Sequence, residues 1–283
     1  MKKQKSDRKV QPVLVYTDFT DTGNKAMQWA VFVCSEMNRR LIVLHVADHN
    51  TRIMASGDDP IAWARKKLSD IKAHTELHYN VRTSTHVEEG CNCTVISRCS
   101  EDEDVIFAIC GVHAKNDPQY LSGKTVVKMA RRSRIPFLFV QKNTPDPTGL
   151  QKIAFPVSIQ RQVKEKVSWG IFLSKHLRRE VVMLTPKEKD EIRNNLLFTQ
   201  KFFQQLEIQF SEQPLDTGFL NIEPKAMHYA FKNSFLLSVL LLAKGKSFTE
   251  LLLGPQELRF ICNKYHHAVF MLNPRKDLYI PCI

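Results

Sequence analysis

Short apolar runs alternate with longer segments of helical spacing along this chain. The first run, residues 12–17, is followed by a polar turn and then by apolar positions that recur with the period of one helix face over residues 26–37. Residues 48–59 are polar and predict a loop. Strands that alternate with helices are joined by right-handed crossovers, so we expect a mostly parallel sheet. The runs of the first half that we interpret as strands are 12–17, 41–47, 80–87, 104–110 and 135–140.

A second unit of the same kind follows a linker. Residues 142–151 contain two prolines and a glycine between apolar runs, which is typical of a connection between domains. The pattern then repeats with a period of about 140 residues, far longer than a solenoid repeat. We expect an α/β fold of two tandem domains, 1–145 and 146–283, each built on an open, mostly parallel five-stranded sheet. The strands expected in the second half are 152–157, 181–185, 207–211, 235–242 and 267–272.

Composition narrows the class of partner. The 283 residues carry a formal net charge of +12, which favours anionic partners such as nucleotides, nucleic acid, acidic proteins or anionic membrane surfaces. The longest apolar stretch, residues 235–243, is much shorter than the roughly 18 residues of a membrane span. No apolar segment of a signal peptide follows the basic N-terminus. We therefore expect a cytoplasmic protein without a membrane partner.

The strand ends carry a family resemblance. Residues 13–20 (VLVYTDFT), 41–46, 104–111 and 135–140, together with their order, resemble the universal stress protein family. The resemblance covers residues 12–141 and 152–272. It implies an adenine nucleotide alpha hydrolase-like sheet that often dimerises through its last strand. It also implies ATP binding by a loop with the pattern Gly-x-x-Gly, nine residues, then Gly and Ser or Thr.

The first half keeps part of that loop. Gly111 holds the first position and Ala114 replaces the second glycine, while Gly123 follows after eight residues instead of nine. Glycines let backbone N–H groups approach phosphate oxygens, and the N-terminus of the following helix favours anions. The resemblance implies that ATP, with Mg²⁺ as its companion, binds in the first half. The residues implied are Asp18 at the nucleoside, and Gly111, His113, Ala114, Gly123, Lys124 and Thr125 at the phosphates.

The second half has largely lost the loop. Ser158 stands where the first half has Asp18, and Leu241 and Lys244 stand at the two glycine positions. Pro255 replaces the hydroxyl residue and has no N–H group to donate. We expect that this half does not bind ATP in the manner of the family.

Structural roles compete with some of these assignments. Asp18 can instead cap the helix that follows it, and Gly123 to Thr125 can be an ordinary helix start. A Walker-type phosphate loop is not expected, because Pro118 stands where that motif needs a glycine. His45 ends an apolar run and is expected to be a hydrogen-bonded histidine at the edge of the core.

A cysteine cluster also stands out. Cys91-x-Cys93, with Cys99 nearby, suggests a metal or redox site. No second pair with zinc-type spacing occurs elsewhere, so we expect ordinary thiols and no metal site.

These patterns favour a binding protein over a conventional catalyst. No nucleophile elbow, paired-carboxylate arrangement or metal triad is found, so at most slow ATP hydrolysis is expected. We expect a stress-response protein that binds ATP or another adenine nucleotide, and the alternative is a nucleotide-free scaffold that binds proteins. The basic residues 128–134 lack interleaved aromatics, so nucleic acid is not an expected partner. Residues 137–140 and 268–272 are expected to pair as an intramolecular pseudo-dimer, and a further homodimer is left open.

Overall fold

The computed structural model describes residues 10–113, 121–160, 162–242 and 257–273. The expected strand segments have become strands, and the inner strands are buried because helices cover both faces of the sheet, whereas the two edge strands, residues 83–89 and 210–215, are partly exposed. The strands are β1 (Val13–Tyr16), β2 (Leu41–Ala47), β3 (Thr83–Glu89), β4 (Phe107–Gly111), β5 (Phe137–Val140), β6 (Lys152–Pro156), β7 (Glu180–Pro186), β8 (Phe210–Leu215), β9 (Leu237–Leu241) and β10 (Ala268–Leu272).

The helices connect these strands in the expected alternation, with short 3₁₀ turns at 147–149, 190–192 and 219–221. No helix in the described ranges is long and apolar enough to cross a membrane. The helices are α1 (Asp21–Met37), α2 (His49–Ala55), α3 (Pro60–Tyr79), α4 (Asn92–Asp102), α5 (Gly123–Arg132), α6 (Val163–Leu177), α7 (Arg193–Gln205), α8 (Ile222–Lys232) and α10 (Glu257–Ile261).

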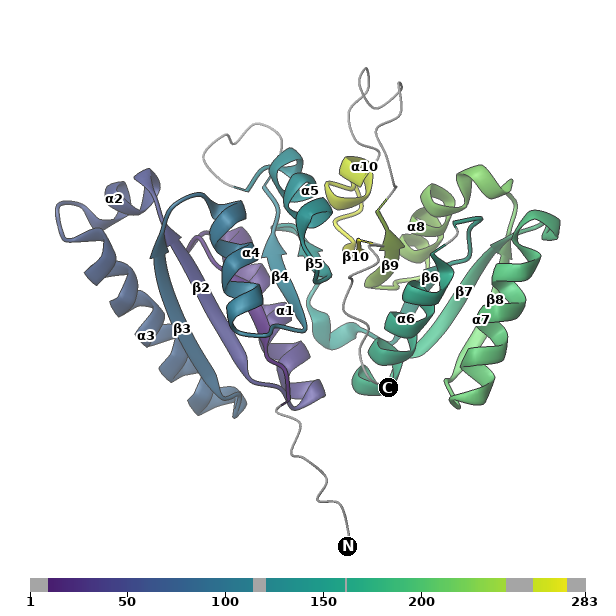
Figure 1. The fold of residues 1–283 in the computed structure, drawn as a ribbon, viewed down its shortest axis with the longest axis horizontal. Coiled ribbons are helices and arrows are strands. Elements are labelled where there is room, and N and C mark those ends of the chain that lie inside the picture. The colour runs from purple at the N-terminus through teal and green to yellow at the C-terminus, as the bar shows by residue number, and fades with distance from the viewer. Residues whose placement is uncertain (1–9, 114–120, 161, 243–256, 274–283) are drawn as a thin grey trace, which may run out of the picture.

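The two halves join into one ten-stranded sheet with the order β3-β2-β1-β4-β5-β10-β9-β6-β7-β8. All pairs are parallel except the central one, in which β10 runs antiparallel to β5 with Val269 opposite Phe139. The expected pairing of residues 137–140 with 268–272 is confirmed, and it removes two sheet edges from solvent. Figure 1 shows β5 and β10 at the centre of the molecule, with α5 and α10 together beside them. The boundary between residues 145 and 146 stays a prediction.

One apolar core crosses this junction. Trp169 of α6 is 0% exposed, and its ring lies 6.3 Å from that of Phe107 in β4 and 5.3 Å from that of Phe270 in β10. Trp29 of α1 is equally buried and belongs to the same cluster. The two halves therefore share apolar side chains as well as strand hydrogen bonds.

The repeat is regular enough to match residues of the two halves. Trp29 corresponds to Trp169, about 140 positions later, and the helices α1 and α6 both end at a residue in the left-handed conformation, Asn38 and Arg178. The same offset matches Val15 with Phe155 and Ala30 with Gly170. The second half therefore has a larger residue in the strand and a smaller residue in the helix that faces it. A Cβ atom on Gly170 would lie 2.7 Å from Cε2 of Phe155.

We expect the substitution Gly170→Ala to lower the free energy of unfolding by about 1–3 kcal/mol, because the added methyl group meets the Phe155 ring. Urea unfolding followed by circular dichroism measures the loss. The double variant Phe155→Val with Gly170→Ala restores the pair found in the first half and should cost less than the two single changes together. Strict additivity of the two losses would contradict the proposed packing.

Two expectations about local structure are wrong. Residues 48–59 are not a continuous loop, because the Asp48 carboxylate accepts from Thr51 N–H and the Thr51 hydroxyl accepts from Asp48 N–H, a capping box that starts α2. The strand expected at 207–211 lies at Phe210–Leu215, because Glu207 takes a left-handed conformation and ends α7 first. Pro214 fits this strand because β8 is an edge strand.

Candidate functional site

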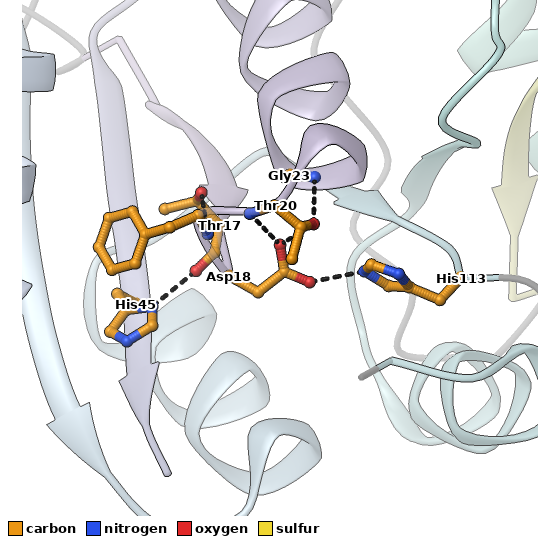
Figure 2. Close-up of polar contacts among 7 residues, drawn as sticks. Thr17, Asp18, Thr20, Gly23, His45 and His113 are labelled. Atoms are coloured by element: carbon orange, nitrogen blue, oxygen red, sulfur yellow. Dashed lines mark hydrogen bonds and ion pairs between the residues drawn. The ribbon is translucent and has the colours of Figure 1, made fainter. Parts of the chain in front are cut away.

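The carboxylate of Asp18 is the centre of a polar cluster where β1 ends. Its Oδ1 atom accepts hydrogen bonds from the N–H and the hydroxyl of Thr20, at 3.1 and 2.6 Å. The Thr20 hydroxyl in turn accepts from the N–H of Gly23, which makes Thr20 the N-cap of α1. Figure 2 shows this relay from the helix to the carboxylate. The capping role considered for Asp18 therefore belongs to Thr20, and Asp18 holds Thr20 in place.

The second oxygen of Asp18 faces His113, which follows β4. Oδ2 of Asp18 lies 2.6 Å from Nε2 of His113, and the two residues are only 6% and 8% exposed (Figure 2). Burial raises the pKa of Asp18, but the hydrogen bonds from His113 and Thr20 outweigh it and bring the pKa below its usual value. Asp18 is therefore an ionised acceptor at neutral pH, held between two segments that are far apart in the sequence.

A second histidine fixes the other side of this turn. Nδ1 of His45 in β2 donates to the carbonyl of Thr17 at 2.8 Å, and Nε2 lies 3.0 Å from the Thr51 hydroxyl. Burial is the main cause that lowers the pKa of His45, which favours the neutral ring. Phe19, in the left-handed conformation, packs on the His45 ring at 4.3 Å. His45 is thus a satisfied structural histidine, and it supports the backbone next to Asp18.

The loop residues divide into those near Asp18 and those that are not. Gly111 ends β4, and a Cβ atom there would lie 2.7 Å from the carbonyl oxygen of Thr22, so this glycine lets α1 approach β4 closely. The N–H of His113 donates to the carbonyl of Leu121 at 3.2 Å, which brings the two ends of the loop together. Ala114 lies outside the described residues.

The first turn of α5 holds the remaining predicted residues. A Cβ atom on Gly123 would lie 2.6 Å from Sγ of Cys262 and 2.7 Å from Cδ2 of Leu258, so this glycine is required where α5 packs against the second half. The Thr125 hydroxyl lies 3.0 Å from that of Ser122, and Lys124 is exposed. These contacts give Gly123 a packing role that the first half alone does not reveal.

Residues 9–141, which contain all of this cluster, match the model of the universal stress protein family. The first domain, residues 9–141, therefore belongs to the universal stress protein family. No curated protein sequence matches the chain.

Solved structures extend the likeness to both halves. A universal stress protein from Archaeoglobus fulgidus has a TM-score of 0.70 at 12% identity, and the match covers 93% of this chain and 98% of that one. A functionally unknown protein from Pseudomonas aeruginosa has a TM-score of 0.61 at 13% identity and covers 95% of this chain and 94% of its own. At these identities the likeness shows the fold alone. It establishes two tandem domains with the fold of universal stress proteins.

The corresponding position in domain 2 is built differently. Ser158 replaces Asp18, and the side-chain amide of Asn195 donates to the carbonyls of Ser158 and Gln160 at 2.7 and 3.0 Å. Leu241 ends β9, whereas Lys244 and Pro255 lie outside the described residues. The expected lack of ATP binding in this domain stays a prediction.

A buried lysine also distinguishes domain 2. Lys166 of α6 corresponds to Ala26 of α1 and is 3% exposed. Its Nζ donates to the carbonyl of Pro156 at 2.6 Å and lies 4.8 Å from the centre of the Phe155 ring. Burial lowers the pKa of Lys166 to about 8, against the opposing attraction of Glu223. The sequence alone could have revealed this lysine, because Lys166 stands at the position that matches Ala26 of the first half. A lysine at a core position of a helix is rare.

Proposed function

We propose that domain 1 binds an adenine nucleotide, ATP in the first place, as the ligand of a stress-response protein. The observation that carries the proposal is the meeting of Asp18 and His113 across adjacent strands β1 and β4. From β1 the chain moves to β2 on one side and later returns to β4 on the other, so this pair lies at the topological switch point. Open α/β sheets bind their ligands outside the carboxyl ends of the strands at that point.

The chemistry of the pair suits a nucleoside and its phosphates. The ionised Asp18 carboxylate accepts hydrogen bonds from hydroxyl or amino groups, and His113 and the exposed Lys124 supply cationic or donor groups for phosphate oxygens. No group of three metal-ligating side chains exists in the described part of the chain, so Mg²⁺ would bind through the phosphates of ATP.

Calorimetric titration of nucleotide-stripped protein with ATP and Mg²⁺ tests the proposal. We expect one site per chain, and we expect Asp18→Ala to weaken binding by about tenfold or more, because it removes an ionised hydrogen-bond acceptor. Ser158→Ala, at the corresponding position of domain 2, is the matched control and should leave the affinity unchanged. Gly123 is a poor probe because a side chain there meets α10. Equal affinities of the wild type and Asp18→Ala would contradict the proposal.

The contacts of Asp18 and Gly123 favour a nucleotide-free scaffold as the second candidate. Thr20 and His113 already satisfy the Asp18 carboxylate, and Gly123 already has a packing role. Two of the larger cavities, of about 800 and 670 Å³, also lie away from Asp18, at the amino ends of the first strands and along α1 and α3. No heat with ATP up to about 1 mM, where binding is worth only about 4 kcal/mol, would support the scaffold.

A further inference from the structure

Two cysteines lie together at the turn between β3 and α4. Cys91 is the N-cap residue of α4 and is exposed, and Cys93 in the first helical turn is partly buried. Gly90, just before them, has a φ of 136°, which only glycine adopts without strain. The pair lies apart from the contact between Asp18 and His113, although Cys93 reaches the carbonyl of Thr125 in α5.

The surroundings of the two thiols shift their pKa values in opposite directions. The backbone N–H groups of Cys93 and Thr94 are the main cause that lowers the pKa of Cys91, although neither makes a well-formed capping hydrogen bond to its sulfur. Burial, and then the charge of Cys91, raise the pKa of Cys93, with Lys128 opposing this. Cys91, at the solvent-facing helix N-terminus, therefore ionises more readily than Cys93.

Three other cysteines, Cys34, Cys99 and Cys110, are core residues. Cys34 and Cys110 are completely buried, and burial raises the pKa of both thiols far above the usual value. Burial also raises the pKa of Cys99 to about 12. The pair at the start of α4 thus combines solvent access with a second thiol two residues away.

We propose that Cys91 and Cys93 form a hydroperoxide-reactive thiol pair that closes to a disulfide. The Cys91 thiolate attacks the outer oxygen of the hydroperoxide, the O–O bond breaks, and the departing alkoxide or hydroxide takes up a proton to leave as alcohol or water. Cys91 then carries a sulfenic acid. The Cys93 sulfur attacks the Cys91 sulfur, the S–O bond breaks, and the hydroxyl group leaves as water with the Cys93 proton. The two thiols are oxidised by two electrons and the peroxide is reduced by two.

The backbone permits this closure. Residues two apart have Cα atoms roughly 5–7 Å apart, a span that overlaps the range of about 4.4–6.8 Å found across disulfides. Closure also has a consequence for the neighbouring helix, because the Cys93 thiol donates to the carbonyl of Thr125 in α5 at 3.7 Å. The disulfide removes that donor, so oxidation loosens the contact between α4 and α5.

Peptide mass spectrometry tests the proposal on the full chain. Trypsin releases residues 83–98 as one peptide that contains Cys91 and Cys93 and no other cysteine. The reduced protein is treated with about one equivalent of hydrogen peroxide, blocked with N-ethylmaleimide and digested. We expect this peptide to appear unlabelled and about 2 Da lighter than its dithiol form. In Cys93→Ser we expect a sulfenic acid at Cys91 that dimedone traps, and in Cys91→Ser we expect neither product.

The exposed Cys262 provides an internal comparison within the same molecule. Cys91 should react with peroxide faster than Cys262 at neutral pH, because the backbone N–H groups at the start of α4 lower the pKa of Cys91. Equal rates, or a labelled dithiol peptide after Cys262 has been oxidised, would overturn the proposal. A dimedone adduct on Cys91 in the wild type without any disulfide would also overturn it, because Cys93 would then not resolve the sulfenic acid. The result does not depend on nucleotide, so it is separate from the ATP titration.

Discussion

Replacing Trp169 with alanine is expected to lower the free energy of unfolding by about 3–5 kcal/mol, because the side chain is completely buried between the two halves. The indole packs against Phe107 of the first half and against Phe172 and Phe270 of the second. Its removal leaves a cavity in the shared core. Urea unfolding followed by far-ultraviolet circular dichroism measures the loss.

A partly exposed tryptophan serves as the control. Trp63 of α3 makes an edge contact with Phe19 near the surface, so Trp63→Ala should cost much less than Trp169→Ala. Because the core continues across β5 and β10, we also expect both halves of the wild type to unfold in one transition. Two separate transitions in the wild type, with only the second shifted by Trp169→Ala, would contradict a shared core.

Raising the pH from about 8 to 10.5 is expected to stabilise the protein through Lys166 by about 3 kcal/mol. In this window the buried amine has already lost its proton in the folded state, whereas the same amine in the unfolded chain still carries one. The unfolded state thus binds more protons, and stability rises with pH until the unfolded lysine also titrates. Below pH 8 both states are protonated and the contribution is constant.

Variants isolate this contribution from those of other titrating groups. Lys166→Met should abolish the Lys166 part of the rise, whereas Lys164→Met, on the exposed face of the same helix, should retain it. Chemical unfolding of the three proteins at several pH values between 7 and 11 gives the slopes. A slope in Lys166→Met that equals the wild-type slope would show that Lys166 has an ordinary pKa in the folded protein. The raised pKa of Glu223, also caused chiefly by burial, has the opposite sign, because its contribution to stability falls as the pH rises above 4.5.

The sequence predicts most of the sheet well because the strands between the edge strands β3 and β8 are almost completely buried. Runs such as residues 41–47 therefore appear as continuous apolar segments. The pairing of β5 with β10 is expected from the resemblance, because the family often dimerises through its last strand. The order of the strands also brings Asp18 and His113 together, because the neighbouring parallel strands β1 and β4 end at the same edge of the sheet.

What the sequence missed depends on contacts between distant segments. Gly123 has the appearance of a phosphate-loop glycine, yet its packing against α10 is visible only when the second half is in place. Thr20 was missed as the N-cap of α1, although a threonine next to the acidic Asp21 at a helix start is a recognisable cap signal. The boundaries of α2 and β8 depended on a capping box and a left-handed residue, which apolar periodicity does not report.

The antiparallel junction of β5 and β10 also frees this molecule from a constraint of symmetry. In a homodimer that closes through the same strand, every substitution occurs twice about the axis, so a change that suits one subunit is imposed on the other. Here both subunits of the pseudo-dimer are encoded separately, and each position has two independent residues. Ala26 can remain small in the core of the first half while Lys166 is buried at its counterpart, and one half can specialise without the other.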